Sequence, residues 1–144
     1  MGYRVKKKTK GGDVEKLLKH LKEISEKHIQ IGYFQDTGDH PTAEIPFADL
    51  MHIHELGLGN YPARSVLGTG LQDIAEQPTE QYLTSFKKLI VDVGKSNTNI
   101  NNVAEEAKDI VKDVFGDSRL TITSNPTPLV DTGELRDALT YKIE

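Results

Sequence analysis

Apolar residues recur at spacings of three and four along much of the chain, which is the pattern of amphipathic helices. A first helix is predicted over 13–24, with Asp13 as its N-cap and an apolar stripe of Val14, Leu17, Leu18, Leu21 and Ile24. A second helix is predicted to start at Pro46, because the first turn of a helix does not need the amide hydrogen that proline lacks. Gly57 is expected to end it in a left-handed conformation.

The longest helical pattern covers 63–93 and is interrupted by Pro78. Proline removes one backbone donor and crowds the preceding turn, so this stretch is either one long kinked helix or two helices that share a corner. We expect the kinked helix. The clearest helix follows the candidate caps at 97–99, keeps its apolar spacing to Val114 and ends at Gly116.

Two short stretches favour strands. Residues 29–34 are rich in β-branched and aromatic side chains, and residues 139–143 alternate apolar with polar side chains, as in a half-buried strand. We expect these two stretches to pair with each other. The segment 35–44, which contains Asp, Gly and Pro in a cluster, is predicted to be a loop.

A cap motif marks a further short helix before the last predicted strand. With Asp131 as N-cap, Glu134 occupies the third helical position, where its carboxylate can bond the amide of the cap. Val130 and Leu135 fall on the two positions of a hydrophobic staple. The chemistry of this segment predicts a helix of one or two turns.

These elements together predict an α+β fold, with several helices, one of them long and kinked, packed on a small mixed or antiparallel sheet. The chain of 144 residues is long enough to bury one core, and we find no internal repeat. We therefore expect a single domain over 1–144, in which residues 1–12 form a basic flexible arm.

Composition excludes several classes of protein. The chain has no cysteine, which argues against a disulfide-rich scaffold, thiolate zinc sites and a cysteine nucleophile. No apolar run approaches the roughly 20 residues that span a bilayer, and the first residues lack the apolar region of a signal peptide. We expect a protein of a reducing, aqueous compartment, with no membrane partner and no cofactor.

Charge is distributed unevenly along the chain. Residues 1–28 contain nine Lys or Arg and four Asp or Glu, a net charge of +5, whereas residues 29–144 contain nine and eighteen, a net charge of −9. The basic run ends at Lys10 and is followed by two glycines. Such a run either contacts nucleic acid or is a solvated terminus, and the acidic remainder opposes broad phosphate binding.

Histidines and acids gather at 39–55 and raise the question of a metal site. His40, His52, His54 and Glu55 are of the types that bind zinc. However, His52 and His54 are two positions apart and so point in different directions on a helix, and no HExxH motif is present. We expect no metal site and no catalytic residues. A metal-dependent hydrolase that uses these residues stays an alternative, as does a nucleic-acid-binding module that uses the basic arm.

Two segments resemble a known family. The stretch His54-Glu55-Leu56-Gly57 followed by Tyr61-Pro62-Ala63-Arg64-Ser65-Val66-Leu67 resembles the "HE-x-G … P-x-R-x-F-L" segment of the tail-completion and neck proteins of tailed bacteriophages. The stretch from Pro128 to Tyr141 resembles the "PLVDTGxLRxSI" ending of that family. The residues that carry the resemblance are His54, Glu55, Gly57, Pro62, Arg64, Leu67, Pro128, Leu129, Asp131, Thr132, Gly133, Glu134 and Leu135.

The resemblance implies a structural virion protein and not an enzyme. Members of this family complete the tail or join it to the connector of the head, so the implied location is the neck of the virion, with host cytoplasm as the site of assembly. The implied partners are the tail terminator and the head–tail connector. A homo-oligomeric ring, with the sixfold symmetry of a tail, is the implied assembly.

Arg64 has two possible roles within the first motif. In the first role, a salt bridge or hydrogen bond from Arg64 locks the turn after Pro62 or reaches a carboxylate of a partner. In the second role, Arg64 pairs within the chain with Glu55. The residues Asp131 to Glu134 are expected to be structural, with Gly133 allowing a close approach of backbone.

Overall fold

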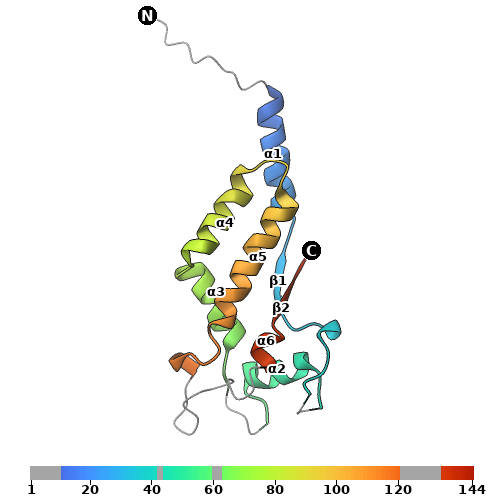
Figure 1. Cartoon of the computed structure of the whole chain (residues 1–144), viewed down its shortest axis with the longest axis vertical. Helices are drawn as coiled ribbons and strands as arrows, with labels where there is room; N and C mark the ends of the chain where they lie inside the picture. The colour runs from blue at the N-terminus through green and yellow to red at the C-terminus, as the bar shows by residue number, and fades with distance from the viewer. Residues whose placement is uncertain (1–10, 42–43, 60–62, 121–133) are drawn as a thin grey trace, which may run out of the picture.

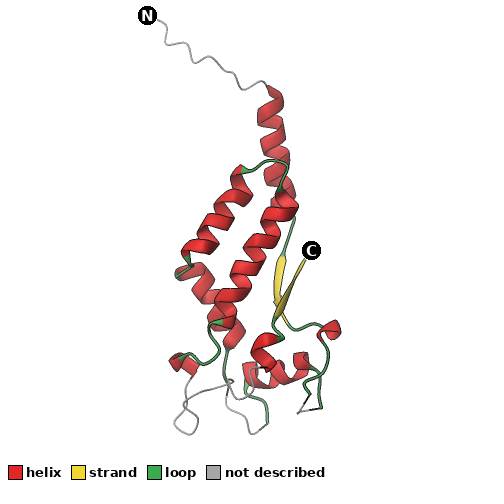
Figure 2. Cartoon of the chain, in the orientation of Figure 1, coloured by secondary structure: helices red, strands yellow, loops and turns green. Residues whose placement is uncertain are grey.

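The structure, a computed structural model, describes residues 11–41, 44–59, 63–120 and 134–144. Within these ranges six α-helices accompany a two-stranded antiparallel sheet, which confirms the α+β fold class (Figure 2). The molecule is elongated, with α1 at one end and α2 and α6 at the other (Figure 1). None of the helices described is both long and apolar enough to cross a membrane.

The helices and strands of the described residues follow one another in a fixed order along the chain. Their bounds are α1 Gly11–Ser25, β1 Ile29–Gly32, η1 Gln35–Thr37, α2 Phe47–Leu56, α3 Val66–Glu76, α4 Glu80–Val91, α5 Ser96–Lys112, η2 Ser118–Leu120, α6 Glu134–Asp137 and β2 Thr140–Ile143, where η1 and η2 are 3-10 helices.

Helix α5 forms the centre of the molecule. It is the helix predicted over 97–116, and it lies with α3 and α4 along one side and the sheet along the other (Figure 1). Its apolar side chains are buried along its whole length, which places the core on this helix. The buried residues are Ile100, Val103, Ala104, Ala107, Ile110 and Val111.

Helix α3 approaches α5 closely at Gly70. A Cβ atom added to Gly70 would lie 2.7 Å from the Cγ2 atom of Val111 and 3.0 Å from its Cα atom, so only glycine fits without movement of a helix. Val111 itself is completely buried. The absence of a side chain at position 70 therefore sets the distance between these two helices.

The sheet joins two parts of the chain that are far apart in sequence. β1 and β2 pair in the register Ile29 with Ile143 to Gly32 with Thr140, which confirms the predicted pairing. β1 ends at Gly32, two residues before the predicted end, because the amide of Phe34 donates a hydrogen bond of 2.8 Å to Thr37 Oγ1 and starts a turn. Most of the predicted loop 35–44 is irregular, apart from η1.

The prediction of one kinked helix over 63–93 is wrong. The structure has two helices, α3 and α4, with Pro78 in the corner between them. The Oγ1 atom of Thr79 accepts a hydrogen bond of 3.2 Å from the amide of Tyr82, so Thr79 caps the start of α4. A new cap directly after the proline makes two helices more favourable than a kink.

Two of the predicted caps are also wrong, whereas the predicted end of α2 is confirmed. Asp13 lies inside the first turn of α1, where its charge favours the positive end of the helix without capping it. α5 starts at Ser96, and Asn99 lies within it, where its Nδ2 atom donates to the carbonyl of Lys88 at the end of α4 (3.3 Å). Gly57 ends α2 with φ of 68°, as predicted.

Replacement of Gly70 with alanine tests the close approach of α3 and α5. The added methyl group meets Val111, so we expect G70A to lower the free energy of unfolding by about 1–3 kcal/mol, although alanine favours helices. Urea denaturation followed by circular dichroism measures the change. The control is G12A in α1, where an added Cβ meets nothing within 4 Å. Equal stability of G70A and wild type would contradict the packing described.

Candidate functional site

The two segments that carry the family resemblance meet at one end of the molecule. Val66, which belongs to the first segment, is completely buried, and Leu135 and Leu139 of the second are 6% and 2% exposed. All three belong to one core cluster with Phe47 and other residues at this end. The region formed by the end of α2, the start of α3, and α6 is therefore the candidate site (Figure 1).

The carboxylate of Glu55 organises the corner between α2 and α3. Its Oε1 atom accepts hydrogen bonds from Ser65 Oγ (2.6 Å) and from the amide of Gly68 (2.9 Å). Its Oε2 atom accepts one from the amide of Leu67 (3.0 Å). Two of the amides that the first turn of α3 leaves unpaired are thus satisfied by a residue of the preceding helix, and the negative charge lies at the positive end of α3.

Backbone contacts fix the rest of this corner. Gly57 turns the chain at the end of α2, and a Cβ atom there would lie 2.6 Å from the backbone nitrogen of Ala63, so glycine is required twice over. The amide of Arg64 then donates a hydrogen bond of 2.6 Å to the carbonyl of His54. We name this unit, formed by Glu55, Gly57 and the segment 63–68, the Glu55 corner.

Arg64 is buried beside the corner, with 7% of its surface exposed. The ion pairs among the described residues do not include the pair with Glu55, whose oxygens bond Ser65, Leu67 and Gly68. The guanidinium lies close enough to His54 that burial, followed by the charge of Arg64, lowers the pKa of that imidazole. Of the two roles predicted for Arg64, pairing with Glu55 is not the one observed.

Helix α6 is tied to the first half of the chain by two contacts. The hydroxyl of Tyr33, directly after β1, donates to the carbonyl of Leu135. Burial, and to a lesser degree the charge of Glu55, raises the pKa of Tyr33, so this hydroxyl keeps its proton. The Nε2 atom of His40 lies 3.2 Å from Oε2 of Glu134. The predicted helix in this segment is present as α6.

Several predicted residues lie outside the described residues. These include the rest of the second motif, Tyr61 and Pro62 of the first, and residues 1–10 of the arm predicted over 1–12, whose last two residues belong to α1. They are Tyr61, Pro62, Pro128, Leu129, Asp131, Thr132, Gly133 and residues 1–10. The predicted cap by Asp131 and the staple by Val130 are therefore not tested.

The three histidines of the region 39–55 have different surroundings. His52 is exposed, His40 contacts Glu134, and His54 lies near Arg64. Within 11–41, 44–59, 63–120 and 134–144, no group of three or more His, Asp or Glu side chains is placed to hold a metal ion. Glu55 accepts three hydrogen bonds from the segment that leads into α3, so its carboxylate contributes to the shape of this corner.

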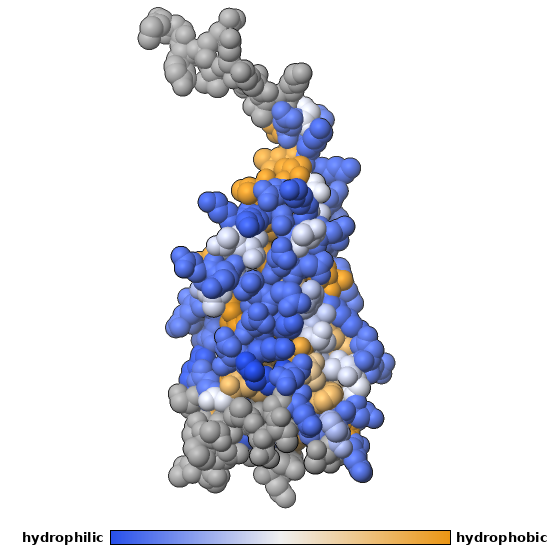
Figure 3. Space-filling model, in the orientation of Figure 1, coloured by the Kyte–Doolittle hydropathy of each residue, from blue (hydrophilic) through white to orange (hydrophobic). Residues whose placement is uncertain are grey.

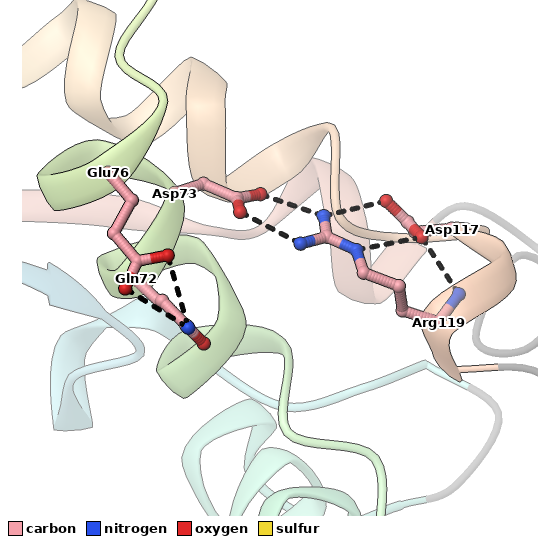
Figure 4. Close-up of polar contacts among 5 residues, drawn as sticks. All are labelled: Gln72, Asp73, Glu76, Asp117 and Arg119. Carbon is pink, nitrogen blue, oxygen red and sulfur yellow. Dashed lines mark hydrogen bonds and ion pairs between the residues drawn. The ribbon is translucent and has the colours of Figure 1, made fainter.

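An ion-pair network not predicted from the sequence borders the site (Figure 4). The guanidinium of Arg119 donates to both carboxylate oxygens of Asp73 at 2.8 Å and also bonds Asp117 at 2.8 Å and 3.1 Å. These bonds fasten η2 to α3. Hydrogen bonds from Arg119 lower the pKa values of Asp73 and Asp117. The spacing of Asp117 and Arg119 is readable in the sequence, whereas nothing in it points to Asp73, 46 positions away.

Comparison of the chain with protein-family models, curated proteins and solved structures gave no match. What bears on function is therefore the geometry above together with the sequence motifs.

Replacement of Glu55 with glutamine tests the Glu55 corner. Glutamine keeps one acceptor but turns an amino group toward backbone amides, so a donor faces a donor. We expect E55Q to lower the free energy of unfolding by about 1–3 kcal/mol, measured by urea denaturation. The matched control is E76Q at the exposed end of α3, where the carboxylate accepts from the side chain of Gln72 and from no other group in the described part of the chain. An effect of E55Q no larger than that of E76Q would contradict the proposed cap.

Acid should weaken the Arg119 network. The pKa values of Asp73 and Asp117 are lowered in the folded protein, so the two ionised carboxylates stabilise the fold. This contribution to the free energy of unfolding is fully present above the ordinary aspartate pKa of about 3.9 and is lost as the pH falls through the lowered values. We expect the difference in stability between wild type and R119M to shrink from about pH 6 to about pH 2.5. K95M, which removes an exposed charge, serves as the control. An R119M difference that stays constant with pH would argue against the network.

Proposed function

We propose that this chain is a non-catalytic structural protein of a tailed-bacteriophage virion, which completes the tail or joins it to the head connector. It acts by assembly into a homo-oligomeric ring, sixfold in the neck of the virion, and by contact with the tail terminator and the head–tail connector. It needs no cofactor. Assembly takes place in the host cytoplasm.

The place of the two motif segments in one hydrophobic core cluster carries this proposal. Val66 of the first segment and Leu135 and Leu139 of the second share one core cluster, although about 70 positions separate them. Segments that resemble one family in the same order, and that also form one structural unit, are expected if the resemblance reflects a common fold. Chance similarity of two short motifs gives no reason for them to meet.

The site itself favours a role in shape. The carboxylate of Glu55 is hydrogen-bonded within the Glu55 corner, and the described His, Asp and Glu residues form no metal-binding group. The net charge of −9 over residues 29–144 disfavours adhesion to DNA that passes through a neck. Neither a hydrolase nor a nucleic-acid-binding module accounts for the second motif.

Measurement of mass in solution, with and without candidate partners, tests the proposal. The purified chain is mixed in turn with the tail-terminator and connector proteins encoded in the same genome neighbourhood, and light scattering reports the mass of each complex. We expect a defined larger complex with at least one of them. Serum albumin, another acidic protein, controls for non-specific attraction of the basic arm.

A shortened chain that lacks residues 1–10 distinguishes binding through the basic arm from binding through the rest of the chain. This chain should still join the complex, because the proposal places the motif segments and not the arm at its centre. A chain that ignores every tail and connector protein would overturn the proposal. Metal content and affinity for nucleic acid would then become the next measurements.

A further inference from the structure

Helices α1 and α4 each expose two neighbouring apolar side chains to solvent. On α1, Val14 and Leu18 are 47% and 60% exposed, and on α4, Leu83 and Phe86 are 52% and 44% exposed. Figure 3 shows an apolar area near the α1 end of a mostly hydrophilic face that also has smaller apolar areas. Isolated exposed leucines are common, but a pair on one helix face invites a partner.

These faces are not the ones that the two helices use within the chain. α1 packs on the body through His20, which is 3% exposed and whose Nε2 atom lies 2.8 Å from the carbonyl of Leu89, and through Ile24. At 100° per residue, Leu18 lies about 160° around the helix from His20. On α4, Leu83 lies about 120° around the helix from the buried Leu89, whereas Phe86 lies about 60° from it and stacks on Tyr82. Each exposed face is therefore available to another molecule.

The charges beside the two leucines follow the same spacing. Glu15 and Lys22 lie three positions before and four positions after Leu18, and Glu80 and Lys87 lie at the same offsets from Leu83. All four charged residues are exposed, and none takes part in an ion pair among the described residues. Residues at such offsets share one helix face with the leucine between them.

An antiparallel alignment of the two faces makes the charges complementary. With Leu18 opposite Leu83, Lys22 lies opposite Glu80 and Glu15 lies opposite Lys87, while Val14 comes toward Phe86. A parallel alignment would instead oppose Glu to Glu and Lys to Lys. The apolar and charge patterns thus agree on one orientation.

We propose that the Leu18 face of α1 in one copy of this chain docks antiparallel on the Leu83 face of α4 in a neighbouring copy. The contact is heterologous, so each copy uses both faces and the contact repeats from copy to copy, giving a ring where the rotation closes. The net charge of +5 over 1–28 then meets a neighbour whose remainder carries −9. The choice of this contact over pairing of two α1 helices rests on the proposed ring, because such a pair would stop at a dimer and leave α4 uncovered.

Disulfide trapping tests the contact, because the chain has no cysteine of its own. L18C is mixed with L83C under mild oxidation, and the rate at which the disulfide-linked dimer forms is measured. The control is L18C mixed with L71C, because Leu71 of α3 is 59% exposed. We expect the first pair to react at least about tenfold faster, since a disulfide needs Cα atoms within about 7 Å. Equal rates for the two pairs would overturn the proposal.

A charge exchange distinguishes the two possible contacts of α1. In L18C, the added changes E15K and K22E should slow trapping with L83C about tenfold, because they replace two ion pairs with two repulsive pairs. The changes E80K and K87E in the L83C partner should restore the rate. If two α1 helices paired with each other, L18C alone would form dimers rapidly, and E15K with K22E in both copies would leave that rate unchanged. This result would overturn the heterologous contact.

Failure here is separable from failure of the proposed function. If the chain joins tail or connector proteins but positions 18 and 83 show no preferred disulfide trapping, only the proposed contact between copies is overturned. If positions 18 and 83 are trapped as expected but the chain binds none of the virion proteins, the contact between copies stands and the assignment to the neck is overturned.

Discussion

The buried face of α5 is the constraint on which the rest of the structure depends. Helices α3 and α4 and both strands pack directly on this one helix, and no other element of the described chain contacts so many neighbours. Small residues let the neighbours approach, with Ala104 completely buried and Gly70 of α3 meeting Val111 without an intervening side chain. Any change that moves α5 therefore moves the motif region at one end and the α1 region at the other.

The two ends of the molecule differ in how their polar groups are satisfied. At the end with α2 and α6, contacts between residues distant in sequence hold the chain, including the bonds to Glu55, the Tyr33 bond to Leu135 and the Arg119 network. At the other end, α1 is held mainly through His20 and Ile24, and its outer face has no partner among the described residues. The first arrangement fixes a shape, whereas the second leaves apolar surface for association.

Periodicity alone was sufficient for most of the fold. The apolar spacing located α1, α2 and α5, and alternation at 139–143 located β2 and its pairing with β1. The prediction was wrong where two local backbone arrangements compete. At Pro78 the apolar pattern fits both a kinked helix and two helices, and the N-cap of Thr79 favours two helices. Within the site, Gly57 was readable because its role is local. The cap by Glu55 and the bond from Arg119 to Asp73 join separate helices or turns, and spacing in one sequence does not encode such pairs.

The pairing of β1 with β2 has a consequence for synthesis of the protein. Gln30 and Glu144, which are hydrogen-bonded across the strands, are 114 positions apart, so β1 leaves the ribosome long before its only strand partner among the described residues. The helices in between rely on nearby contacts and can form early, whereas the sheet has to wait. Until then the edge of β1 and its side of α5 are open, which is a period of exposure to aggregation. A chain interrupted before residue 140 lacks this closure and keeps the edge of β1 unpaired within the described sheet.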